Sequence, residues 1–109
     1  MGITRAADLG RARAREAYYL IMGTIPRDQR DGYVSTLVQI LESHKYQNRK
    51  KTEPPHPRKE PLGESYDPTN PEHKAREVIR SGDLCYNANT ANNLLEGFLT
   101  ELRRLAKHL

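Results

Sequence analysis

The chain has 109 residues, the usual size of one compact domain, and we expect residues 1–109 to form a single small domain. Eighteen Lys and Arg against fourteen Asp and Glu give a net charge of +4, which mildly favours acidic partners. A lone cysteine, Cys85, excludes an intrachain disulfide, and the longest apolar run, residues 17–22, is too short to span a membrane; a cytoplasmic protein is expected.

The first predicted helix covers about residues 5–22, with Thr4 as its cap and Gly23 as a left-handed stop. Helical projection gathers small and apolar residues on one wide side: Ala6, Ala7, Leu9, Ala14, Ala17, Tyr18, Leu20 and Ile21. Because most of these side chains are small, we expect a neighbouring helix to approach this side closely.

A second helix is predicted over about residues 27–47, with Pro26 near its first turn. Its apolar stripe follows helical spacing and consists of Tyr33, Val34, Leu37, Val38, Ile40, Leu41 and His44. Gly32 costs up to about 1 kcal/mol against alanine inside a helix. The regular helix therefore begins either near residue 27 or near Asp31. The two helices together form a predicted hairpin.

Residues 49–69 contain five prolines and charges of both signs, which predicts a long, flexible connection and not a helix or strand. Its basic residues have two interpretations. They belong either to a solubilising linker or to an arm that contacts the phosphates of a nucleic acid. The candidates for such contacts are Arg49, Lys50, Lys51, Arg58 and Lys59.

A short helix is predicted over residues 71–81 because Asn70, Pro71 and Glu72 form a typical helix start: a cap, a preset first turn and an acid at the positive end. Gly82 is expected to end this helix. Asp83 would then cap the next one directly.

The last predicted helix, residues 84–108, has the clearest pattern, with apolar residues alternating at spacings of four and three. Three of four flanking positions are also apolar, which favours a multi-helix bundle over a two-stranded coiled coil. The seam closes either within one chain or between copies, and a homo-oligomer is expected. The seam consists of Leu84, Ala88, Ala91, Leu95, Phe98, Leu102, Leu105 and Leu109. The fold class is therefore all-α, a helical bundle.

Charged residues on the first helix offer a second set of contacts. Arg11 and Arg15 share one side with Tyr19, where they can present charge and a stacking surface to a partner, whereas Arg13 lies on another side. The competing interpretation is that these arginines are solvated and pair with Asp8 and Glu16 at i,i+3 spacing.

No motif of catalysis or cofactor binding is visible in the sequence. The four histidines and Cys85 lie too far apart along the chain for a metal-ligand pattern, and no phosphate-binding glycine loop occurs. We therefore expect no enzyme activity, no cofactor, no metal and no small-molecule substrate.

The function predicted is a small interaction protein, of adaptor or inhibitor type, that binds a protein partner or another copy of itself and no membrane. The alternative is a nucleic-acid-binding accessory or regulatory protein that uses dispersed Arg and Lys side chains on phosphates.

Overall fold

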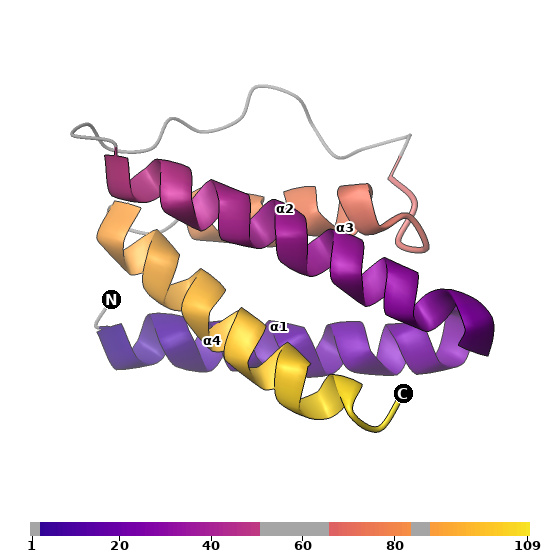
Figure 1. Ribbon diagram of the computed structural model, residues 1–109. Helices are drawn as coiled ribbons and strands as arrows, with labels where there is room; N and C mark the ends of the chain where they lie inside the picture. The colour runs from indigo at the N-terminus through magenta and orange to yellow at the C-terminus, as the bar shows by residue number, and fades with distance from the viewer. Residues whose placement is uncertain (1–2, 51–65, 84–87) are drawn as a thin grey trace.

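The computed structural model describes residues 3–50, 66–83 and 88–109, and its regular elements there are all helices (Figure 1). In chain order they are α1 (Ile3–Thr24), the short 3-10 helix η1 (Arg27–Gln29), α2 (Arg30–Lys50), α3 (Pro71–Asp83) and α4 (Ala88–Ala106). The prediction of an all-α helical bundle is confirmed.

The helices form two layers. Figure 1 shows α1 and α4 crossing in one layer, with α2 and α3 side by side in the other. The turn through η1 reverses the chain between α1 and α2, but α1 packs mainly against α4, and α2 packs against α3 and α4. The last helix therefore joins the two layers.

The predicted seam of α4 lies in the core of this bundle. Ala91, Leu95, Phe98 and Leu102 are buried, while Leu105 and Leu109 are half-buried. Leu84 and the side chain of Ala88 lie outside the described residues. Helices of the same chain cover the four buried residues, so their burial requires no second copy.

The predicted close approach to α1 is present where α4 crosses it. Gly10 and Gly97 stand at the crossing: a Cβ on Gly10 would lie 2.8 Å from the Phe98 nitrogen, and one on Gly97 would lie 2.9 Å from the Ala7 carbonyl carbon. Ala6, Ala14 and Ala17, from the predicted small-residue side, are fully buried. The two backbones therefore meet without side chains between them.

Helix ends differ from the prediction at several points. Helix α1 begins at Ile3, so Thr4 is a helical residue and not the cap. The helix continues through Gly23, which is not a left-handed stop, since no described glycine has a positive φ. At this end of the helix, the Arg30 guanidinium donates to the carbonyl of Met22, within α1, and to that of Ile25, directly after α1, at 3.0 Å each. This contact replaces the left-handed glycine that we expected.

The remaining ends shift by a few residues. Helix α2 includes Arg49 and Lys50, which we had assigned to the connection, because the prolines that end helices begin only at Pro54. Helix α3 passes through Gly82 and ends at Asp83, so Asp83 is not the first cap of α4. Helix α4 ends at Ala106 and turns follow it.

The predicted start of α3 is confirmed atom by atom. The Asn70 side-chain oxygen accepts a hydrogen bond from the Glu72 N–H at 2.9 Å, and the Asn70 carbonyl accepts one from the Lys74 N–H at 3.1 Å. Residues 66–70, just before this start, form a turn closed by a hydrogen bond from the Asn70 N–H to the Asp67 carbonyl. The last part of the predicted connection, residues 66–69, is thus non-helical as expected.

Candidate interaction surface

The outer side of α1 carries the three contact residues that the sequence predicted there. Arg11, Arg15 and Tyr19 follow one another at four-residue spacing, so they lie along one side of the helix, and Met22 continues that side. Tyr19 is 69% exposed and Met22 is 44% exposed, and the rings of Tyr18 and Tyr19 form a T-shaped pair. We call Arg11, Arg15, Tyr19 and Met22 the α1 surface.

The charges of the α1 surface are partly neutralised. Arg11 bonds to Asp8, the i,i+3 partner expected for a solvated arginine. Arg15 instead reaches across to α4, where its Nη1 donates to Glu101 Oε2 at 2.9 Å. Arg104 donates from its Nε to the other oxygen, Oε1, at 2.7 Å. Glu101 therefore binds two arginines, which come from different helices.

Glu101 is buried although it is ionised. The bond from Arg104, with a further bond from Arg15, lowers the pKa of this carboxyl in spite of the opposing effect of burial. We refer to Arg15, Glu101 and Arg104 as the Glu101 triad. Sequence reasoning missed the triad; its one available signal was the acid in an otherwise apolar helix stripe.

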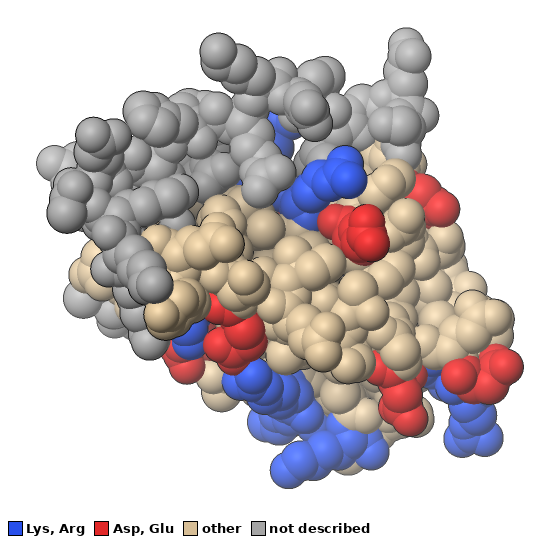
Figure 2. All heavy atoms as spheres, turned by 45° about the horizontal axis from the view of Figure 1, so that its top comes forward, with Lys and Arg blue, Asp and Glu red and all other residues tan. Residues whose placement is uncertain are grey.

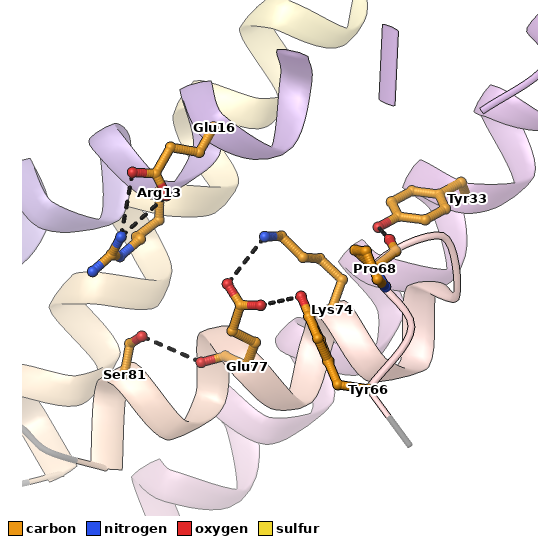
Figure 3. A network of polar contacts seen from close by, with 8 residues as sticks. All are labelled: Arg13, Glu16, Tyr33, Tyr66, Pro68, Lys74, Glu77 and Ser81. Carbon is orange, nitrogen blue, oxygen red and sulfur yellow. Dashed lines mark hydrogen bonds and ion pairs between the residues drawn. The ribbon is translucent and has the colours of Figure 1, made fainter. Parts of the chain in front are cut away.

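Arg13 lies away from the α1 surface, as its position in the helix predicted. Its guanidinium bonds to Glu16 at 3.1 Å, the partner expected for a solvated arginine, and Figure 3 shows this pair apart from the polar groups of α3. The Nε of Arg13 is buried without a hydrogen-bond partner among the described residues.

A second polar cluster, not predicted from the sequence, lies around Glu77 of α3. Figure 3 shows Lys74 and Tyr66 on either side of its carboxylate. The Lys74 ammonium is buried and donates at 3.0 Å, and the Tyr66 hydroxyl donates to the other oxygen. Nearby, the Tyr33 hydroxyl donates to the Pro68 carbonyl at 2.7 Å. The cluster fastens residues 66–68 to α2 and α3.

The protonation of the cluster suits this anchoring role. Burial, with smaller contributions from Glu77 and Asp67, raises the pKa of Tyr33 to about 12. Burial and the bond to Glu77 raise the pKa of Tyr66 as well. Hydrogen bonds from Thr69 lower the pKa of Asp67. At neutral pH both hydroxyls therefore keep the protons that they donate, and neither is prepared to act as a base.

The predicted basic arm lies mostly outside the described residues. This applies to Lys51, Arg58 and Lys59, whereas Arg49 and Lys50 are the last residues of α2, where the structure describes the backbone. The interpretation of these five residues as nucleic-acid contacts stays a prediction.

Positive charge is not gathered into one broad patch on the face in Figure 2. Most Lys and Arg atoms lie at its lower edge with Asp and Glu beside them, and a further basic group lies above the centre next to an acidic one. Two depressions lie beside α2, and among the described residues His44 lines one of them and Tyr33 lines the other. Within residues 3–50, 66–83 and 88–109, no three His, Cys, Asp or Glu side chains meet as metal ligands would.

Among the described helices none is long and apolar enough to cross a membrane. A scan against protein-family models, a search of curated proteins and a search of solved structures found no significant match to this chain.

Proposed function

We propose that this chain is a small helical interaction protein, of adaptor or inhibitor type, that binds a protein partner through the α1 surface. The single observation that supports this most is the exposure of Tyr19, at 69%, beside Met22 and Arg15 on one side of one helix. Tyrosine, methionine and arginine are the residue types enriched in protein interfaces, and tyrosine and arginine dominate binding energies there.

Two further expectations belong to this proposal. Self-association is one, and a second copy of the chain is then the partner at the α1 surface. A cytoplasmic location is the other, supported by the single cysteine of the sequence.

Photo-crosslinking tests the proposal. A photoreactive phenylalanine analogue replaces Tyr19 in cells that express the chain, and in a control it replaces Tyr46, an exposed tyrosine of α2 that is 58% accessible. We expect a protein adduct from position 19 and none of the same mass from position 46. Light scattering and the adduct mass then distinguish a second copy from a different protein.

The partner identified in this way is purified and titrated against variants. Tyr19→Ala should weaken binding by about tenfold or more, as truncation of a central interface tyrosine does, and Tyr46→Ala should leave it within about twofold. Equal adducts at both positions, or equal losses for both variants, would contradict the proposal. If Tyr19 crosslinks to a nucleic acid instead, and the affinity of the chain for that nucleic acid falls steeply with salt, the alternative function is the correct one.

A further inference from the structure

The Glu101 triad contains one more positive charge than negative. Two guanidinium groups bind the two oxygens of one carboxylate, at 2.9 Å and 2.7 Å, and this holds the two cations near each other. Two neighbouring positive charges raise each other's energy, and one carboxylate neutralises only one of them. The triad therefore retains a net charge of about +1 to offer to an additional anion.

Both arginines have donors left for such an anion. Arg15 uses Nη1 on Glu101 and Arg104 uses Nε, and their other N–H groups have no partner among the described residues. The side chains are 51% and 62% exposed, so these donors face water. A guanidinium presents its donors in a planar fork that matches a carboxylate.

Exposed apolar side chains follow Arg15 along α1. Tyr19 follows Arg15 by one helical turn, and Met22 follows Tyr19 on the same side. A ligand that covers both parts must combine an anionic group with a neighbouring apolar group. An acidic residue close to a large apolar residue in a peptide segment satisfies this requirement.

We propose that the α1 surface and the Glu101 triad bind an acidic segment of a protein partner, one carboxylate on Arg15 and Arg104 and a neighbouring apolar side chain on Tyr19 and Met22. This inference rests on the proposed function and specifies the chemistry of the partner. A continuous phosphate backbone fits less well, since Asp8 neutralises Arg11 and the triad offers about one net positive charge.

A peptide selection tests the inference. A random dodecapeptide library displayed on phage is selected on the folded protein, and the peptides recovered are synthesised and titrated by fluorescence polarisation. We expect peptides with Asp or Glu close to a Leu, Phe or Trp. Replacing that acid by its amide should weaken binding about tenfold, the value of one charge-assisted bidentate contact.

Arg103 provides a matched control. It is the neighbour of Arg104 on α4, is 54% exposed, and pairs with Glu42 of α2 instead of with Glu101. Arg104→Gln should weaken peptide binding about tenfold, whereas Arg103→Gln, with the same change of charge, should alter it by less than about twofold. Circular dichroism confirms that both variants keep their helices. Arg104→Lys, which keeps the charge without the fork, should fall between them.

Two results would overturn the inference. One is a set of selected peptides without enrichment in acids, and the other is equal binding to wild type and Arg104→Gln. Peptides that need Tyr19 but contain no acid would reject this chemistry while leaving the proposed function intact. Failure of the proposed function appears separately, as equal crosslinking from Tyr19 and Tyr46.

Discussion

Replacing Gly97 by alanine tests the closest contact of the fold, the crossing of α1 and α4. The new Cβ would lie 2.9 Å from both the Cα and the carbonyl carbon of Ala7, and closer still to the Ala7 oxygen. All three atoms belong to the backbone, so no side chain can rotate out of the way. The two helices must move apart instead, by about 0.5–1 Å to restore normal carbon–carbon distances near 3.5 Å.

The cost follows from this movement. A gap of ~0.5–1 Å removes about a quarter to a half of the dispersion energy across a contact, and overpacked cores lose about 1–3 kcal/mol. The upper end applies because the obstacle is backbone. Alanine regains about 1 kcal/mol of helix propensity relative to glycine. We therefore expect Gly97→Ala to lower the free energy of unfolding by about 2 kcal/mol.

Gly32 provides the control for this prediction. It lies inside α2, is exposed, and a Cβ there meets nothing within 4 Å. Gly32→Ala should therefore raise the free energy of unfolding by about 0.5–1 kcal/mol, so the same substitution has opposite signs at the two positions. Urea unfolding followed by circular dichroism measures both changes. A Gly97→Ala variant as stable as wild type would refute the close crossing.

Three further predictions concern single polar groups. Asn70→Ala should lower the free energy of unfolding by about 1 kcal/mol, because the Glu72 N–H loses its acceptor at the start of α3. Tyr66→Phe should lower it by about 1 kcal/mol, since the ring stays but the donor to Glu77 is lost. Glu101→Gln should reduce the loss of stability in acid. Contacts with Arg104 and Arg15 lower the pKa of Glu101 in the folded chain, so the ionised carboxylate contributes fully to stability above the unfolded pKa. This contribution disappears as the pH falls through the folded pKa, and the Gln variant has none to lose.

Urea titrations at neutral pH check the first two of these predictions, and titrations at a series of pH values between neutral and strongly acidic check the third. An Asn70→Ala variant with wild-type stability would argue against the cap. An unchanged midpoint for Tyr66→Phe would mean that water replaces the Glu77 contact. Wild type and Glu101→Gln with parallel pH profiles would show that the Glu101 carboxyl has the same pKa in the folded and unfolded chain.

Local sequence determined much of the fold. The start of α3 was predictable because Asn70, Pro71 and Glu72 act on backbone groups within four residues. The small-residue side of α1 was predictable from helical spacing, and so was the buried stripe of α4. These features depend on periodicity and on near neighbours, which one sequence displays.

Contacts across the bundle could not be predicted in the same way. Arg15 and Glu101 are separated by 86 positions, and only the crossing of α1 and α4 brings them together. The bonds of Arg30 to the carbonyls of Ile25 and Met22 span fewer residues, but they depend on the geometry of the turn between α1 and α2. Tyr66 reaches Glu77 because the chain turns back before α3, whereas Lys74 and Glu77 are i,i+3 neighbours within that helix. Charged residues at apolar positions of a helix, such as Glu101, are the signal that points to such contacts.

The pairing of α1 with α4 leaves α1 without its main neighbour while the chain is being synthesised. Among the described helices, α1 is made before the others, and its main neighbour, α4, is made after them. At about 5–20 residues per second, Gly10, Ala14 and Ala17 stay in water for several seconds before α4 arrives. During this interval the small side chains expose little apolar surface, which limits aggregation of the nascent chain.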